Sequence, residues 1–348
     1  MERIGVIFGG RSGEHEISLL SATSVITALE KSKYQVVCIG ITRKGQWKLF
    51  QGEPYKIKNG QWEEESTDFN FGNLKSIIDF ALPILHGPFG EDGKIQGVFE
   101  MLDIPYGGCG VLASSLAMDK ALAKDVFRDK GLPCCKYIVL SEHDIISDGD
   151  HVLEKLEQDL GFPMFVKPSN MGSSVGISKA RERSQLKEAL ELALKYDRRI
   201  IVEEAVNCRD VETGVIGNSE LEVAAVGEIV AKNDFYDYKA KYSDDVGTEL
   251  VIPARLPKEI CQEIKNLAKM AYKAIDCEGY ARIDFFIEKG TDRLYINEIN
   301  TIPGFTKYSM FPELWREVGL EFGQLIERIV ELGYERYYAK NNRETVQY

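Results

Sequence analysis

The sequence predicts an α/β protein whose amino-terminal part is an open parallel sheet and whose remainder is an α+β region. Residues 3–8 are apolar and β-branched, end in the pair Gly9-Gly10, and precede a helical periodicity over residues 17–29. A further apolar run at residues 36–41 completes a βαβ unit, which predicts parallel strands and a right-handed crossover. Open sheets of this kind bind ligands at their carboxyl edge, where the glycine turn lies.

The composition excludes several classes of protein. The chain has 348 residues, enough for two or three domains, and 44% hydrophobic with 28% charged residues is typical of a globular protein with a sizeable core. A net charge of −12 disfavours nonspecific binding to nucleic acid or to an anionic membrane, so we expect neither partner. The sequence has no signal peptide and no apolar run of about 18 residues, which favours a cytoplasmic location. Its seven cysteines form no C-x-x-C motif, so we expect reduced thiols and no metal held by sulfur.

A predicted hairpin near the carboxyl terminus gathers polar side chains on one face. The segment RIDFFIEKGTDRLYINEIN alternates with a period of two in both halves, and a glycine-containing turn joins them. Arg282 and Asp284 share one face of the first strand, and Glu298 and Asn300 share one face of the second. Carboxylate and amide oxygens suit Mg²⁺, which often completes its shell with substrate phosphates. The alternative is a solvated hairpin face with ordinary surface charges.

A second element is suited to binding phosphate. Residues 162–168 form a predicted strand that ends with Lys167, and the Gly/Ser loop SNMGSSVGIS returns the chain to another strand. Backbone N–H groups of such a loop can surround an anion, to which a lysine adds a point charge. The sequence contains no Walker motif, which argues against a P-loop enzyme.

The remaining elements are assigned by periodicity and composition. Strands are expected at residues 81–85 and 200–204, and helices from residue 96 and at residues 112–130, 185–195, 257–275 and 313–332. Residues 51–75 are expected to be irregular, residues 141–150 to form an acidic loop, and the polar tail from Gly333 to fray.

The hairpin and its continuation, RIDFF followed by NEINTIPGFT, resemble the carboxy-terminal signature of the D-alanine:D-alanine ligases in the ATP-grasp superfamily. The resemblance extends over nearly the whole chain except about the last dozen residues. It implies a pre-ATP-grasp substrate-binding domain at residues 1–108, a central ATP-grasp lobe at 109–202, and a carboxy-terminal lobe at 203–348 with the lid loop and Mg²⁺ site. It also implies that two Mg²⁺ ions, with Mn²⁺ as a substitute, bind the residues matching Asp284, Glu298 and Asn300.

The resemblance assigns further positions to ATP. It implies phosphate contacts for Lys120 and Lys167, an adenine amino contact for Glu203, adenine-edge contacts for the backbone of Glu204 and Val206, a ribose contact for Asp210, and a place in the mobile lid for Lys241. At position 210 the family usually has Glu, so the shorter Asp puts the ribose contact in doubt. Sequence spacing alone does not separate Lys120 from an ordinary exposed lysine on a helix.

The same resemblance assigns the substrate side of the site in three groups. Glu14 would meet the ammonium of the first D-alanine and would be linked through Ser173 to the lid residue Tyr242. Arg282 and the backbone N–H of Gly304 would face the reacting acyl phosphate and the oxyanion. His86, Ser309 and Met310 would contact substrate, with Ser309 receiving the second carboxylate and the proton role of His86 left open. By itself, Glu14 is better explained as a helix-start carboxylate that the helix dipole favours.

The implied function is ATP-dependent ligation of two D-alanines through an acyl phosphate, for peptidoglycan precursor synthesis. The alternatives are a D-alanine:D-serine or D-alanine:D-lactate ligase of the same fold and, from another class, a nucleotide-binding regulatory protein without turnover. Family members are commonly dimers through the amino-terminal domain, so a homodimer is expected. Relatives making D-alanyl-D-serine or D-alanyl-D-lactate have Arg where this chain has Met310, which favours D-alanine as second substrate.

Overall fold

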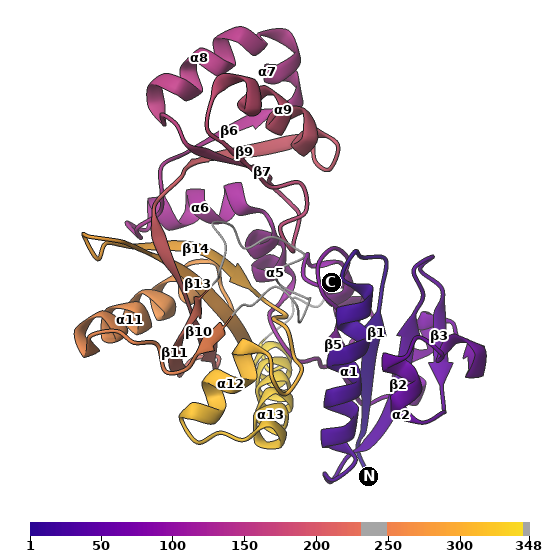
Figure 1. Cartoon of the computed structure of the whole chain (residues 1–348). Coiled ribbons are helices and arrows are strands. Elements are labelled where there is room, and N and C mark those ends of the chain that lie inside the picture. Colours follow the sequence, from indigo (N-terminus) through magenta and orange to yellow (C-terminus); the bar gives the residue numbers. More distant parts are fainter. Residues whose placement is uncertain (231–248, 344–348) are drawn as a thin grey trace.

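The computed structural model describes residues 1–230 and 249–343 and contains three β-sheets arranged around a common centre (Figure 1). The amino-terminal sheet has the order β4-β3-β2-β1-β5. Its strands are β1 (Arg3–Gly9), β2 (Gln35–Ile41), β3 (Trp47–Phe50), β4 (Ser66–Asp68) and β5 (Phe80–Ile84). Its helices are α1 (His15–Leu29), α2 (Pro54–Lys58), α3 (Leu74–Ile77) and α4 (Lys94–Met101).

The predicted parallel sheet is correct only at its centre. Strand β1 is parallel to both β2 and β5, but β3 and β4 extend the sheet in antiparallel pairing. Residues 51–75, expected to be irregular, contain α2, α3, β4 and the short 3₁₀ turns Glu63–Glu65 and Phe71–Asn73. This region also contributes Trp62, whose ring is 1% exposed and meets the ring of Phe8 edge-on at 5.2 Å. Periodicity could not detect these elements, because each is too short to show one.

The central sheet has the order β6-β9-β7-β8 and is antiparallel throughout. It comprises β6 (Tyr137–Ser141), β7 (Met164–Pro168), β8 (Ser178–Ala180) and β9 (Arg199–Glu204), with α7 (Glu142–Ser147), α8 (Gly149–Asp159) and α9 (Arg183–Leu194). The strand, glycine loop and returning strand predicted around Lys167 are confirmed by β7 and β8. The prediction of a loop at residues 141–150 is wrong. A capping box between Ser141 and Asp144 starts helix α7 there.

The third sheet carries the predicted hairpin and has the order β12-β11-β10-β13-β14. Its strands are β10 (Cys208–Ile216), β11 (Glu222–Val230), β12 (Glu249–Val251), β13 (Tyr280–Glu288) and β14 (Leu294–Asn300). Helix α11 (Lys258–Ala274) packs on one face of this sheet, and its core there is shared with α5 (Val111–Met118) and α6 (Lys120–Asp129). Helix α12 (Met310–Glu317) contacts strands β10 and β11 of the same sheet. The hairpin is confirmed as β13 and β14.

Two of the expected helices are each divided in the structure. The helix expected at residues 112–130 breaks at Asp119, whose extended backbone and side-chain bond to the Leu122 N–H start α6 at Lys120. The helix expected at 313–332 is replaced by α12 and α13 (Phe322–Asn341), with Gly319 at φ +91° between them. Both breaks therefore occur where a cap or a left-handed backbone ends the helical run.

The carboxy-terminal tail was expected to fray from Gly333, and this is wrong as far as residue 343. Helix α13 continues to Asn341 and packs on the amino-terminal lobe, where the rings of Tyr334 and Phe80 lie 4.9 Å apart. Arg336 donates to the backbone carbonyls of Tyr106 and Gly108, and its guanidinium lies 3.9 Å from the centre of the Tyr106 ring. The tail therefore holds two lobes together.

We expect Arg336→Ala to lower the free energy of unfolding by about 1–3 kcal/mol, because it removes two hydrogen bonds to half-buried carbonyls and a ring contact. Chemical denaturation measures this change. The matched control is Arg328→Ala on the same helix, whose exposed pair with Glu331 should be worth less than about 0.5 kcal/mol. Equal effects of the two substitutions would contradict the anchoring role.

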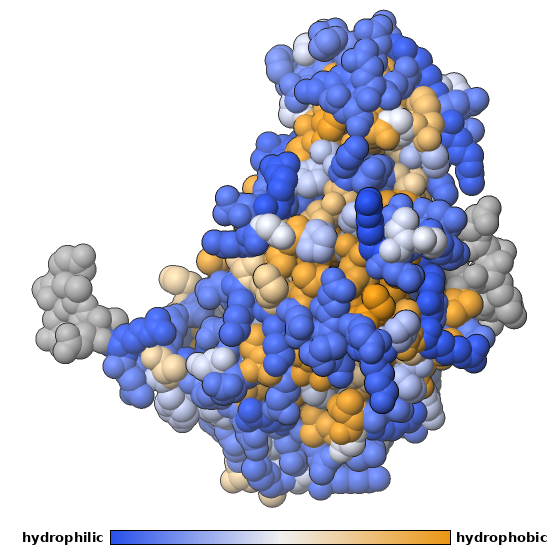
Figure 2. Space-filling model, turned by 90° about the vertical axis from the view of Figure 1, so that its left-hand side faces the viewer, coloured by the Kyte–Doolittle hydropathy of each residue, from blue (hydrophilic) through white to orange (hydrophobic). Residues whose placement is uncertain are grey.

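The surface matches the polar composition. Figure 2 shows one face that is mostly hydrophilic, with apolar side chains visible in patches between the polar ones. Within residues 1–230 and 249–343, no helix combines the length and the apolar character needed to cross a membrane.

Candidate functional site

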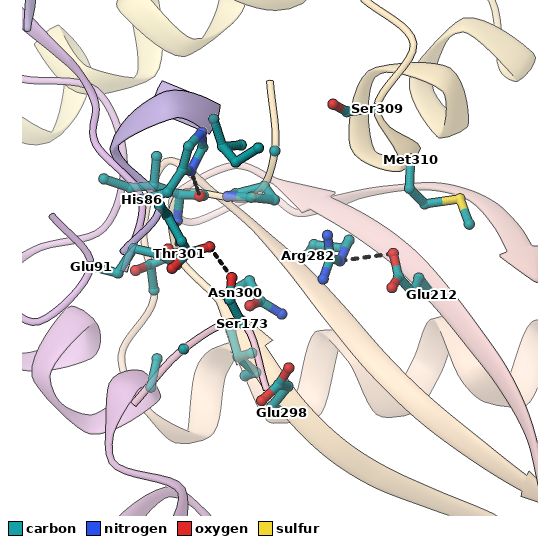
Figure 3. A pocket seen from close by; sticks show the side chains of 18 of the residues that line it. His86, Glu91, Ser173, Glu212, Arg282, Glu298, Asn300, Thr301, Ser309 and Met310 are labelled. Atoms are coloured by element: carbon teal, nitrogen blue, oxygen red, sulfur yellow. Dashed lines mark hydrogen bonds and ion pairs between the residues drawn. The ribbon is translucent and has the colours of Figure 1, made fainter. Parts of the chain in front are cut away.

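A cavity of about 560 Å³ lies where the three sheets face one another, and it brings together residues far apart in the sequence (Figure 3). Most of the predicted substrate and metal residues line it, together with the predicted phosphate contact Lys120: Glu14, His86, Ser173, Arg282, Glu298, Asn300, Gly304, Ser309 and Met310. The predicted metal ligand Asp284 is not among the lining residues. In Figure 3, His86 and Glu91 lie on one side of the cavity, and Ser309 and Met310 lie on the other. The cavity therefore joins elements of all three lobes.

Strand register explains why the polar side chains of the hairpin meet. Glu212 on β10 stands opposite Asp284 on β13, and Asp284 stands opposite Glu298 on β14. In the next cross-strand row, Arg282 stands opposite Asn300. Side chains of such rows point to the same face of the sheet, so five polar groups share one surface.

Arg282 is held by two carboxylates. Its Nε and one terminal nitrogen donate to the two carboxylate oxygens of Asp284 at 2.7 and 2.8 Å, and its Nε also lies 2.8 Å from Glu212. Burial alone would lower the pKa of Arg282, but these two carboxylates hold it well above the ordinary value. The guanidinium is therefore a fixed positive charge in the cavity wall.

The donor set at the end of the hairpin fits hard metal ions through its carboxylates. Glu298 lies 3.2 Å from Lys120, and Asp284 also accepts from the Asn300 amide at 3.0 Å. These oxygens already attract cations and donors, and a turn of the Asn300 amide would add its oxygen to the set. In the described ranges, no group of three His, Cys, Asp or Glu side chains is placed to hold a metal.

The glycine loop of the central sheet closes over the cavity. Lys120 donates to the carbonyl of Met171 at 2.7 Å, and the Ser173 hydroxyl donates to Glu14 from the amino-terminal lobe. The other carboxylate oxygen of Glu14 packs against Gly87, where a Cβ would lie 2.3 Å from it and where φ is +70°. Position 87 therefore requires glycine, which lets the Glu14 carboxylate approach the backbone.

His86 joins the amino-terminal lobe to the loop after β14. Its Nδ1 donates to the carbonyl of Ile302 at 2.9 Å, so in the neutral ring its Nε2 accepts from the Ser21 hydroxyl at 3.0 Å. Ser21 in turn accepts from the Phe305 N–H at 3.3 Å. Burial lowers the pKa of His86 below its ordinary value, although the charge of Glu14 partly offsets it. His86 is therefore a neutral connector that positions the loop containing Gly304.

Ser309 and Met310 begin α12 at the edge of the cavity. The Ser309 hydroxyl accepts from the Thr306 N–H at 3.1 Å and lies 2.8 Å from the Thr306 hydroxyl. Met310 is 6% exposed and is one of the residues that line the cavity, while its sulfur packs toward Gly227 on β11. The wall near Met310 is thus apolar, whereas the wall near Ser309 has a hydroxyl.

A second group of charged residues lies outside the cavity lining, on β7, β9 and α6. Lys167 donates to one carboxylate oxygen of Glu203 at 2.8 Å, and Lys124 lies 3.4 Å from the other. Burial alone would raise the pKa of Glu203, but Lys124 and Lys167 hold it below its ordinary value. Two buried lysines face one carboxylate, so the group has a net positive charge and suits an anionic ligand.

The remaining predicted ATP residues are not gathered at the cavity. Glu204 accepts from the Lys136 N–H at 2.8 Å, Val206 follows β9, and Asp210 is half-buried in β10. Lys241 and Tyr242 fall outside the described residues.

Sequence reasoning missed three residues of the site: Glu91, Lys124 and Glu212. Lys124 had a signal, because it follows Lys120 by four positions and shares its helix face.

Comparisons with known proteins agree over nearly the whole chain. Family models described as D-ala D-ala ligase N-terminus and C-terminus match residues 3–109 and 126–331. A D-alanine–D-alanine ligase from Acetivibrio thermocellus is 45% identical over 364 residues, which cover 97% of this chain and 96% of the relative. One from Geobacillus thermodenitrificans is 46% identical over 355 residues, covering 97% of each.

Solved structures show the same fold. The VanG D-Ala:D-Ser ligase from Enterococcus faecalis superposes with a TM-score of 0.87 at 36% identity, covering 95% of this chain and 99% of that one. The D-alanine-D-alanine ligase from Coxiella burnetii superposes with a TM-score of 0.86 at 30% identity. The match covers 98% of this chain and 97% of that one. The predicted α/β fold with an ATP-grasp architecture is confirmed. The chain belongs to the D-alanine–D-alanine ligase family.

Proposed function

We propose that the chain is an ATP-dependent ligase that joins two D-alanines through an acyl phosphate, in the synthesis of peptidoglycan precursors. The observation that carries this proposal is the convergence of three lobes on one cavity. There the carboxylate of Glu14, the guanidinium of Arg282 and the acidic end of the hairpin meet. Such a cavity suits an amino acid, which brings an ammonium and a carboxylate, beside a nucleotide that brings phosphates.

The phosphate side of the reaction depends on positive charge. Glu298, Asp284 and Asn300 are the residues that would hold Mg²⁺, two ions in our proposal, with Mn²⁺ as a substitute. When bound, these ions would offset the charge of the transferred phosphoryl group. Lys120 lies beside Glu298 and is positioned to meet the same phosphates. We further propose that Lys167 contacts phosphate and that Glu203, Glu204, Val206 and Asp210 surround the adenosine, with Lys241 in the lid.

The acyl side of the reaction depends on fixed donors. Arg282 is locked by Asp284 and Glu212, so it needs no reorganisation as an oxyanion develops. The backbone N–H of Gly304 would be the second donor, on the loop that His86 and Ser21 anchor. Glu14, together with Ser173 and the lid residue Tyr242, would hold the ammonium of the first D-alanine.

Turnover separates this proposal from a nucleotide-binding protein without catalysis. We expect ADP release from ATP to require both D-alanine and Mg²⁺, and the product mass to be that of a dipeptide. ATP binding without ADP release in the presence of D-alanine would favour the binding-only alternative.

We predict that D-alanine is preferred over D-serine as the second substrate. Met310 is an apolar, adaptable wall that suits a methyl group and offers a serine hydroxyl no partner. Leaving that hydroxyl unpaired costs on the order of 1–3 kcal/mol, which corresponds to a roughly ten- to hundredfold preference. Competition at equal concentrations of D-alanine, D-serine and D-lactate, read by product mass, measures the ratios. A mixed dipeptide equal to or exceeding D-alanyl-D-alanine would instead assign the chain to the D-alanine:D-serine ligases, and a depsipeptide with D-lactate to the lactate-forming ones.

The domain boundaries 1–108, 109–202 and 203–348 are retained as proposals. The three sheets support a three-part division, although β9 extends to Glu204, and α5 and α6 share their core with the third sheet. We also propose a homodimer through the amino-terminal domain, as family resemblance suggests, which light scattering of the purified chain would test.

A further inference from the structure

Lys124 is a buried lysine to which the proposed reaction gives no role. Its side chain on α6 is 1% exposed, and its Nζ lies 3.4 Å from one carboxylate oxygen of Glu203 on β9. Lys167 on β7 donates to the other oxygen at 2.8 Å, and Glu203 is itself 2% exposed. Three charged groups from three elements therefore meet away from water. Burying charges is costly, which makes such a cluster a candidate for a function.

The two lysines of this cluster differ in what else they can reach. Lys167 ends β7 just before the glycine loop, and the proposed reaction assigns it to phosphate. Lys124 lies four positions after Lys120 on α6, one turn further from the start of the helix, and the charge of Glu203 holds it in place. When Lys167 turns to a phosphate group, Lys124 is the cation that stays at Glu203.

The other ionisable groups around the pair are neutral or engaged elsewhere. Asp125, the next residue of α6, accepts from an arginine and a tyrosine at 2.7 Å each. Cys134 and Cys135 approach from the segment before β6, and burial raises the pKa of both thiols, to about 12 for Cys135, so they are uncharged at neutral pH. Glu204, the next residue of β9, accepts a backbone N–H at 2.8 Å. The charge of Glu203 is thus set by its two lysines.

We propose that Lys124 positions Glu203 as an ionised acceptor for the amino group of adenine, and that this buried pair selects adenine against purines with a carbonyl oxygen in its place. An ionised carboxylate accepts hydrogen bonds and donates none, so it attracts an amino group and repels a carbonyl oxygen. Lys124 acts through Glu203 and is a positioning residue. The inference rests on the proposed contact between Glu203 and adenine, and it involves no covalent change.

The titration behaviour agrees with this geometry. Burial alone would raise the pKa of Glu203, but Lys124 and Lys167 hold it below its ordinary value. Burial alone would lower the pKa of Lys124, but Glu203 holds it above its ordinary value. Removing Lys124 should therefore raise the pKa of Glu203, so that the carboxylate gains a proton as the pH falls. A protonated carboxyl group can donate to a carbonyl oxygen, which would weaken the selection at low pH.

Nucleotide binding tests the inference without turnover. ADP and inosine diphosphate (IDP) differ at this position of the purine, so calorimetric titration of the full-length enzyme with each, in the presence of Mg²⁺, measures the selection. We expect wild type to bind ADP at least about a hundredfold more tightly than IDP at both pH 6 and pH 8. In Lys124→Met, the ratio of the two affinities should fall at least about tenfold at pH 6 and recover in part at pH 8. Protonation of the phosphates affects both nucleotides alike and cancels in the ratio.

Matched variants separate selection from packing. Lys130→Met makes the same change at the exposed end of α6 and should keep the wild-type ratio at both pH values, as should Lys124→Arg, which keeps the charge. If Lys124 only supported packing, Lys124→Met would weaken ADP and IDP alike, and an unchanged ratio at both pH values would overturn the inference.

Two further variants decide the question if Lys124→Met fails to fold. Lys124→Gln can still donate to Glu203 but carries no charge, so the same loss of selection at pH 6 is expected. Glu203→Gln has an amide that both accepts and donates, so with both lysines intact it should lose the selection equally at pH 6 and pH 8. A wild-type ratio in Glu203→Gln would contradict the inference.

The outcomes also separate the inference from the proposed function. If wild type releases ADP from ATP in response to D-alanine while Lys124→Met keeps the wild-type ratio, the role of Lys124 is overturned and the ligase proposal stands. If wild type binds neither nucleotide, the proposed function is removed as well.

Discussion

Replacing Glu298 by Gln is expected to reduce turnover at least about a hundredfold while leaving the fold intact. Glu298 stands opposite Asp284 in the cross-strand row and lies 3.2 Å from Lys120. A neutral amide cannot offset the charge of that lysine or of a bound metal ion, so the phosphate end of the cavity would lose its organising carboxylate. The side chain is 20% exposed, so the amide can still be hydrated and the structural cost should be small.

The measurement is the rate of ADP release over a wide range of Mg²⁺ at saturating D-alanine, combined with the thermal midpoint. Glu288→Gln is the matched control, because it makes the same change at the far end of the same hairpin, where the carboxylate bonds to Thr291. We expect the control to keep the turnover and the midpoint of wild type. Wild-type turnover in Glu298→Gln at ordinary Mg²⁺ would remove this residue from the metal site.

The hairpin could be predicted from the sequence because its signal is local. Alternation with a period of two fixed which side chains share a face, and the register then placed Arg282 opposite Asn300 and Asp284 opposite Glu298. The glycine loop after Lys167 was predictable for a similar reason, since a strand ending at a Gly/Ser run leaves few alternatives. These two elements contribute Arg282, Glu298, Asn300 and Ser173 to the cavity.

Other parts of the site depend on distant segments and were not predictable in this way. Glu91 belongs to the cavity because Gly87 and Ile302, which are 215 positions apart in the chain, both bond to it. Lys124 is 1% exposed only because Glu203 lies across from it on another element, whereas an isolated helix would leave it in water. Likewise, the tail is polar in composition and was therefore expected to fray. Its arginine and tyrosines contact the amino-terminal lobe through their polar ends, and a local sequence pattern does not reveal such contacts.

Replacing Arg282 by Lys is expected to lower kcat at least about a hundredfold, with a smaller effect on the binding of ATP. The guanidinium makes two parallel bonds to Asp284 and reaches Glu212, whereas an ammonium is a point charge that cannot reproduce this fork. The two carboxylates would then be incompletely paired, which should also cost about 1–3 kcal/mol in the free energy of unfolding.

Steady-state kinetics and chemical denaturation measure the two effects of Arg282→Lys separately. The matched control is Arg293→Lys, which makes the same change in the exposed turn of the same hairpin and should alter neither quantity. Arg282 stands on rigid strand β13 and its partners Glu212 and Asp284 stand on adjacent strands, so the lost donor cannot be replaced by movement of a neighbour. The loss should therefore fall mainly on kcat, because the guanidinium acts on charge that develops during the reaction. A kcat in Arg282→Lys equal to that of Arg293→Lys would show that a positive charge alone is enough at this position.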